Sequence, residues 1–204
     1  MGIARNLREL ETKPGDRRLL LVLGGGLVLL IASYLLFLPY FAILAPSGYS
    51  IVDQQTVFTH QANERILAAW KATPGGIRAS LICAWIDLFA FMPAYAAVGF
   101  AWGVLVARRC AGKVRGIGIA CSLCIFPAWL ADIVETAVQA VISLRALTYP
   151  PGLVPIMSTA AVIKMAFFYA ALLWCVVGTI LVIVRRRAGS RISLPRDPRA
   201  PSDN

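Results

Sequence analysis

Charged residues are scarce in this chain. They make up 15% of its 204 residues, against about 25% in soluble domains, while 59% of the residues are hydrophobic. A soluble domain has no way to bury that much apolar surface. The composition therefore excludes soluble globular classes, and it also excludes disordered, collagen-like, coiled-coil and disulfide-knot classes.

Recognised catalytic motifs are absent as well. The chain has no Walker loop, no dinucleotide-binding glycine motif, no HExxH and no GxSxG, which disfavours nucleotide-driven, zinc-protease and α/β-hydrolase chemistry. Its one histidine, His60, does not suffice to build a hydrolase triad. The sequence therefore predicts no particular reaction, no catalytic residue and no cofactor.

The apolar residues gather into four segments, each longer than the about 20 residues that cross a bilayer. These segments are residues 19–45, 80–107, 117–143 and 156–184. Lipid offers the backbone no hydrogen-bond partners, and the segments lack the alternation of barrel strands, so they are predicted to be helices. The predicted fold is an all-α, four-helix transmembrane bundle over residues 19–184, with tails at 1–18 and 185–204. The first segment is too long for a cleaved signal peptide, and the basic second tail is expected to be disordered.

The basic residues lie mainly on one side of these spans. The two tails and the connection between the second and third spans hold 15 Lys and Arg residues, whereas the other two connections hold four. By the positive-inside rule, both termini are predicted to be cytoplasmic, in a multi-pass protein of the cytoplasmic membrane. The basic residues behind the net charge of +10 are then expected to contact lipid headgroups, and nucleic acid is not an expected partner.

The first outer loop, residues 46–79, has a helical pattern of its own. Its apolar positions between Val57 and Trp70 recur at helical spacing, and a Pro-Gly-Gly run at 74–76 ends the pattern. We expect an amphipathic helix that lies in the outer interface, with Trp70 as a headgroup anchor.

Four charged residues fall at a similar depth in spans two, three and four. Counted from the predicted outer ends, Asp87, Asp132, Glu135 and Lys164 lie 7, 11, 8 and 8 positions into their spans, or roughly 10–16 Å at 1.5 Å per residue. A charge that faces lipid is costly, so the four side chains are expected to meet inside the bundle. Tyr95, Gln139 and His60 are candidates for positions around them.

Three carboxylates and one ammonium leave the cluster with excess negative charge. Retained protons or a bound cation would each balance it, and the sequence does not choose between them. A metal site is disfavoured because Lys164 competes for the same oxygens.

Three hypotheses follow. In the first, the cluster is a site that binds a lipid headgroup, a small amphiphile or a cation. In the second, it is a clamp that fixes the helices of a noncatalytic structural or accessory protein. In the third, the chain is a small membrane enzyme that uses Asp132 or Glu135 as acid or base.

Small residues mark close helix contacts. Gly99 and Gly103 have the GxxxG spacing, which indicates packing within the bundle or, as the alternative, a homodimer. Cys121 and Cys124 form a CxxC near the cytoplasmic end of span three. Because disulfide-forming chemistry needs the oxidising side, both cysteines are expected to be apolar fillers.

Several short motifs resemble those of a family of uncharacterised bacterial four-helix integral membrane proteins. They are Ser50-Ile51-Val52-Asp53, Ala62, Ile66 to Trp70, Ile86-Asp87-Leu88-Phe89 with Tyr95, Ala131-Asp132-Ile133-Val134-Glu135, and Lys164. In that family an Asn often follows the acidic residues of helix three, where this chain has Thr136. The resemblance implies the four-helix topology and an inward-facing set of Asp87, Asp132, Glu135 and Lys164, and it implies no reaction or substrate.

Overall fold

The computed structural model describes residues 9–145 and 148–192, and within them it is helical without any strand. Four stretches are long and apolar enough to cross a membrane: Asp16–Ser47, Gly76–Arg108, Gly112–Arg145 and Leu153–Ala188. Each contains one of the predicted spans and extends it by several residues. The prediction of a bundle with four apolar spans is confirmed.

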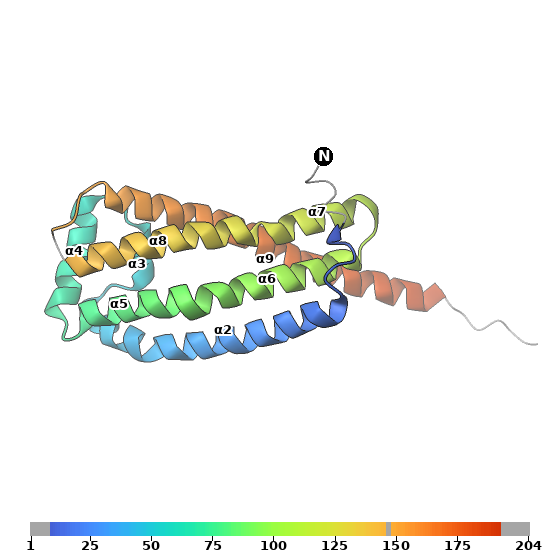
Figure 1. The fold of residues 1–204 in the computed structure, drawn as a ribbon, viewed down its shortest axis with the longest axis horizontal. Helices are drawn as coiled ribbons and strands as arrows, with labels where there is room; N and C mark the ends of the chain where they lie inside the picture. Colours follow the sequence, from blue (N-terminus) through green and yellow to red (C-terminus); the bar gives the residue numbers. More distant parts are fainter. Residues whose placement is uncertain (1–8, 146–147, 193–204) are drawn as a thin grey trace, which may run out of the picture.

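Figure 1 shows the helices that make up these four rods. The first rod is α2 (Asp16–Leu44) with the turn η1 (Ala45–Ser47), and the second is α5 (Gly76–Ile86), the π-helical turn η2 (Asp87–Phe91) and α6 (Met92–Arg108). The third rod is α7 (Gly112–Leu123) and α8 (Ile125–Arg145), and the fourth is α9 (Leu153–Ile192). Two short helices, α3 (Ile51–Thr56) and α4 (His60–Ala72), connect the first rod to the second at one end of the bundle.

Both interruptions of the long rods lie next to a proline. Pro93 is the second residue of α6, and the turn before it is π-helical, with the Met92 amide bonded to the Asp87 carbonyl five residues back. Pro127 is the third residue of α8, directly after the break at Cys124 between α7 and α8. Because proline has no N–H to donate, the helix ladder is disturbed just ahead of it.

One stripe of α2 contacts the rest of the molecule. Its buried residues, Leu19, Gly26, Ser33, Phe37 and Leu44, recur every four or seven positions. That stripe packs on α5, η2 and α6, while large apolar side chains elsewhere on the helix are exposed. A helix that is apolar on every side but buried on only one is suited to a lipid environment.

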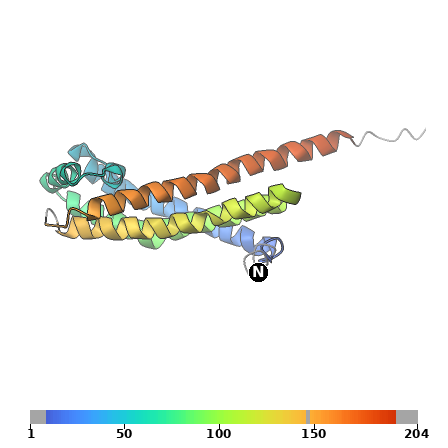
Figure 2. The same cartoon turned by 90° about the horizontal axis from the view of Figure 1, so that it is seen from above.

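The rods are arranged so that α2 and α9 lie on either side of a gap. Helix α9 packs along α8 and also on α6 and α7, whereas α2 and α9 have no extensive contact in the described part of the chain. Helix α3 contacts α9 near this gap. Figure 2 shows α9 extending past the other helices at the end opposite α3 and α4.

The segment between α2 and α5 differs from the single interfacial helix that the sequence predicts. It forms two helices with a break at residues 57–59, and α4 packs on α5 and η1. Its Ile66, Leu67 and Trp70 belong to a core cluster that also includes buried residues of α2, α5, α8 and α9. Trp70 is fully buried and donates its indole N–H to the Tyr49 carbonyl at 3.3 Å. Trp70 is therefore a core residue of this cap, and the expectation of a headgroup anchor is wrong.

At the opposite end, basic residues bind the N-terminal segment. The Arg108 guanidinium donates to the Leu10 carbonyl at 3.0 Å and to the Asp16 carboxylate at 2.7 Å. Arg115 reaches Glu11 at 3.2 Å. Helix α9 runs on to Ile192, so the first residues of the predicted disordered tail at 185–204 are helical, and 193–204 lie outside the described residues.

The glycines of the rods allow close approach within the chain. A Cβ on Gly99 would lie 3.0 Å from Ile125, and one on Gly103 would lie 2.3 Å from the Ser122 hydroxyl. Trp174 fills the space beside Gly118, where a Cβ would lie 2.1 Å from its ring, and donates its indole N–H to the Gly103 carbonyl. A homodimer through Gly99 and Gly103 would require these contacts to open.

We predict opposite effects of alanine at two glycines of α7. Gly118→Ala should lower the free energy of unfolding by about 1–3 kcal/mol because the added methyl overlaps Trp174. In Gly116→Ala the new Cβ has no atom within 4 Å. This substitution should therefore raise the free energy of unfolding by about 0.5–1 kcal/mol, because alanine has the higher helix propensity. Unfolding of both variants in detergent measures this, and equal effects would contradict the packing of Trp174.

Candidate functional site

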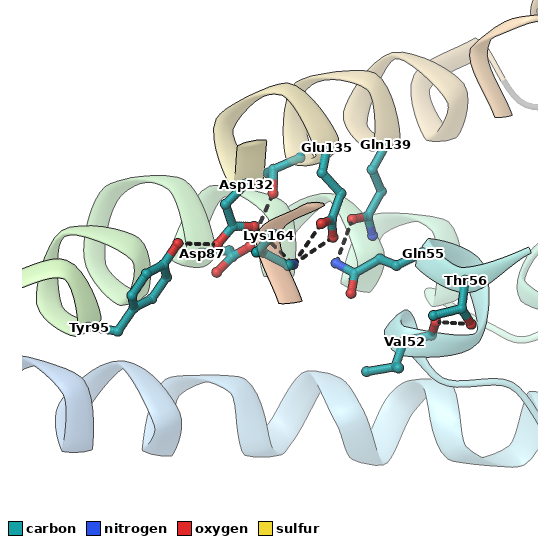
Figure 3. A network of polar contacts seen from close by, with 10 residues as sticks. Val52, Gln55, Thr56, Asp87, Tyr95, Asp132, Glu135, Gln139 and Lys164 are labelled. Atoms are coloured by element: carbon teal, nitrogen blue, oxygen red, sulfur yellow. Dashed lines mark hydrogen bonds and ion pairs between the residues drawn. The ribbon is translucent and has the colours of Figure 1, made fainter. Parts of the chain in front are cut away.

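The four charged residues that the sequence singles out come together in the half of the bundle nearest α3 and α4. Asp132 and Glu135 are buried on α8, Lys164 projects from α9, and Asp87 is the first residue of η2. Figure 3 shows Asp87, Asp132 and Glu135 gathered around Lys164. The helix pairs α8–α9 and α5–α8 are packed, which explains how three separate spans supply one cluster.

Lys164 is the centre of this cluster. Its Nζ lies 3.0 Å from Asp132 Oδ1, 2.8 Å from Glu135 Oε1 and 2.7 Å from Glu135 Oε2. The Glu135 side chain is fully buried and that of Asp132 nearly so. One ammonium on α9 thus bridges two carboxylates one turn apart on α8.

Asp87 takes no part in that bridge. Its carboxylate accepts a hydrogen bond from the Thr136 hydroxyl at 3.1 Å, also from α8. Thr136 is neutral, so this contact leaves the charge of an ionised Asp87 uncompensated. The sequence reasoning missed Thr136, although it follows Glu135 directly.

Two of the three neighbouring candidates join the cluster. The Tyr95 hydroxyl donates to Asp132 Oδ2 at 2.8 Å, and Gln139 accepts from the Gln55 amide of α3 at 3.3 Å. A row of polar side chains therefore runs from Tyr95 to Gln55, as Figure 3 shows. Gln55 was not foreseen, because its place depends on how α3 folds back over the bundle.

His60 lies elsewhere. Its Nε2 is 3.2 Å from Glu64, and its ring packs edge-on against Tyr149 with 4.9 Å between the ring centroids. Tyr149 in turn accepts a hydrogen bond from Asn63 at 2.7 Å. His60 therefore belongs to the cap around α4, and the described lining of the cavity that adjoins the cluster does not include it.

That cavity has a volume of about 350 Å³. Asp87, Tyr95, Asp132, Gln139 and Lys164 line its polar part, together with Gln55. The remaining lining is apolar and mainly aromatic, from α2, α3, α5, η2 and α9. A cavity that is largely apolar with a few convergent polar groups is the usual form of a small-molecule site.

The cavity opens toward the side of the bundle. Among its lining residues Tyr34 on α2 is 56% exposed, Val52 on α3 is 54% exposed and Tyr169 on α9 is 59% exposed. These three elements border the gap where α2 and α9 lack extensive contact. In a bilayer, such an opening faces the lipid.

Helix α3, which borders this opening, is held at its start by a capping box. The Asp53 amide donates to the Ser50 hydroxyl at 3.2 Å, and the Ser50 amide donates to the Asp53 carboxylate at 2.7 Å. These hydrogen bonds from Ser50 hold the pKa of Asp53 below its ordinary value. At the other end of the helix, the Val57 carbonyl accepts from Ser158 of α9.

We predict that Lys164→Met will be strongly destabilising. The substitution leaves Asp132 and Glu135 buried without their cation, and breaking such a bridge costs about 3–5 kcal/mol. Lys71→Met removes an exposed ammonium of α4 and should change stability by less than about 0.5 kcal/mol. Unfolding in detergent measures both.

A triple variant separates lost charge balance from lost packing. Lys164→Met combined with Asp132→Asn and Glu135→Gln removes the unpaired charges and should recover most of the stability lost by Lys164→Met alone. Failure to recover would indicate that the lysine stem, rather than its charge, holds α9 to α8.

No family model, curated protein or solved structure matches the chain. A function therefore has to be inferred from the geometry and charges of the site itself.

Proposed function

We propose that the chain is a multi-pass protein of the cytoplasmic membrane that binds an amphiphile in the cavity between α2 and α9. The polar head would lie against Asp87 and Gln139, and the apolar part would run along the aromatic wall toward the lipid. The distribution of basic residues supports an orientation with both termini in the cytoplasm, which puts the cavity in the outer half of the bilayer.

One observation carries this proposal: a cavity joins the charged cluster to the side of the bundle. A cluster that only fastened helices together would be expected to be closed and dry. Here about 350 Å³ of space touches Asp87, Asp132 and Lys164, and its exposed rim lies where lipid would surround the protein. That volume accommodates a headgroup and the first carbons of a chain, while the rest of the chain extends through the opening.

The hypothesis that the cluster is a clamp applies to Lys164, Asp132 and Glu135 and not to Asp87. The bridge from Lys164 to Asp132 and Glu135 joins α9 to α8, which supports a structural role for these three residues. Since Lys164 already occupies both carboxylates of α8, neither is well placed as the acid or base of an enzyme. Asp87 is left as the carboxylate available to a ligand.

Membership of the bacterial four-helix family belongs to this proposal too. It rests on the residues that carry the resemblance, several of which, including Asp87, Tyr95 and Lys164, line the cavity. The lipid bilayer and an amphiphile drawn from it are the proposed partners.

We predict that a bulky residue inside the cavity will abolish binding. Met165 of α9 lines the cavity, so Met165→Trp should displace the ligand, whereas Ile163→Trp on the exposed side of the same helix should not. Amphiphiles bound to the purified protein are counted by native mass spectrometry. At 100 times its Kd, a ligand also raises the free energy of unfolding by about 2.7 kcal/mol.

The expected result is bound amphiphile and ligand-dependent stabilisation in the wild type and in Ile163→Trp, with both lost in Met165→Trp. If the wild type binds no amphiphile, or if both tryptophan variants bind it equally, the cavity is not the binding site.

A further inference from the structure

We infer that the headgroup bound in this cavity carries an ammonium group. This inference rests on the proposed function and adds the charge class of the ligand. It is drawn from the charges that line the cavity, the rings that enclose it and one buried amide N–H donor that has no acceptor among the described residues.

Among the described residues, the cavity offers an anion no free cation. The charged residues that line it are Asp87, Asp132 and Lys164, and the Lys164 ammonium is already held by Asp132 and Glu135 at 2.7–3.0 Å. The helix across the cavity adds none, since the chain has no Lys, Arg or His between Arg18 and His60. A phosphate or carboxylate headgroup would therefore meet carboxylates without a compensating charge.

Asp87 provides what a cation needs. It lines the cavity, and the hydrogen bond that the described residues give it comes from Thr136, which donates to Oδ2. An ammonium beside its carboxylate would form a charge-assisted contact in surroundings of low dielectric.

The aromatic wall suits the same ligand. Phe41, Phe37, Phe91, Tyr95 and Phe168 form a continuous series of ring contacts, with centroids 5.3–5.8 Å apart. The series crosses from α2 over η2 and α6 to α9, and all five rings line the cavity. Aromatic faces attract cations, and cages of such rings recognise alkylated ammonium groups.

Gln139 adds a second requirement for the ligand, which is a hydrogen-bond acceptor. Its side chain lines the cavity and is 2% exposed, and its Nε2 has no acceptor within the described residues. Gln139 lies three residues beyond Thr136 on α8, or about 4.5 Å along the helix from the residue that holds Asp87. This donor matches an uncharged oxygen near the ammonium, such as an ester oxygen of an amine-bearing amphiphile.

The test compares probes that share one chain length and differ in charge. Full-length protein in maltoside detergent is titrated with dodecylammonium, dodecyltrimethylammonium and dodecyl phosphate, and bound probe is counted by native mass spectrometry. We expect the wild type to bind at least one ammonium probe at least about 10-fold more tightly than the phosphate. This comparison requires no variant.

Asp87→Asn tests whether the Asp87 carboxylate binds the ammonium. The substitution should weaken ammonium binding by about 10- to 100-fold, the usual effect of losing one charge-assisted contact. Glu64→Gln, which removes a carboxylate of the cap away from the cavity, should leave binding unchanged.

The two proposals fail in different ways. Equal or tighter binding of dodecyl phosphate in the wild type, or unchanged ammonium binding in Asp87→Asn, would overturn the ammonium assignment while leaving amphiphile binding in place. If none of the probes binds at a saturable site that Met165→Trp blocks, the binding function itself is overturned.

Discussion

The bridge between Lys164 and the two carboxylates of α8 is the interaction on which the membrane half near α3 and α4 depends. Helices in lipid gain little from apolar contact alone, since the tails around them are equally apolar. A partly buried ammonium that contacts three carboxylate oxygens gives α8 and α9 a fixed register. The other wall of the cavity, α2, has no ion pair beside the cavity among the described residues, because its pair from Asp16 to Arg108 lies at the opposite end of the bundle. It contacts its neighbours along a single stripe. The wall formed by α8 and α9 is thus held by an ion bridge, whereas the wall formed by α2 is held by the packing of its buried stripe on α5, η2 and α6.

Under the proposed function, the residues that hold the helices together are distinct from those that contact the ligand. Lys164, Asp132 and Glu135 satisfy one another and hold the helices, and Tyr95 donates to the same group. Asp87 and Gln139 stand beside them with bonding capacity that the described residues do not use fully. A binding site is most selective when its own frame is satisfied and only the groups meant for the ligand are left free.

Much of this arrangement could be predicted from the sequence. Long apolar runs define the four spans, and the depth of Asp87, Asp132, Glu135 and Lys164 follows from counting residues along rods of known rise. The rest depends on tertiary packing. The pairing of Gln55 with Gln139 spans 84 positions and requires α3 to fold over the bundle. The sequence predicts Trp70 as an interfacial anchor because it does not reveal that α4 shares a buried core with side chains from the ends of the other helices.

The π-helical turn before Pro93 has a consequence for the shape of the site. Asp87 and Tyr95 are eight residues apart, and on a regular α-helix their side chains would point about 80° apart. One extra residue taken up in the turn brings them back to within about 20° of the same direction. The Asp87 carboxylate and the Tyr95 phenol face the same cavity because the π-helical turn holds one residue more than a regular α-helical turn would. Deleting a single residue between Asp87 and Phe91 would leave the two residues seven positions apart, and a regular α-helix with that spacing also directs them to within about 20° of each other.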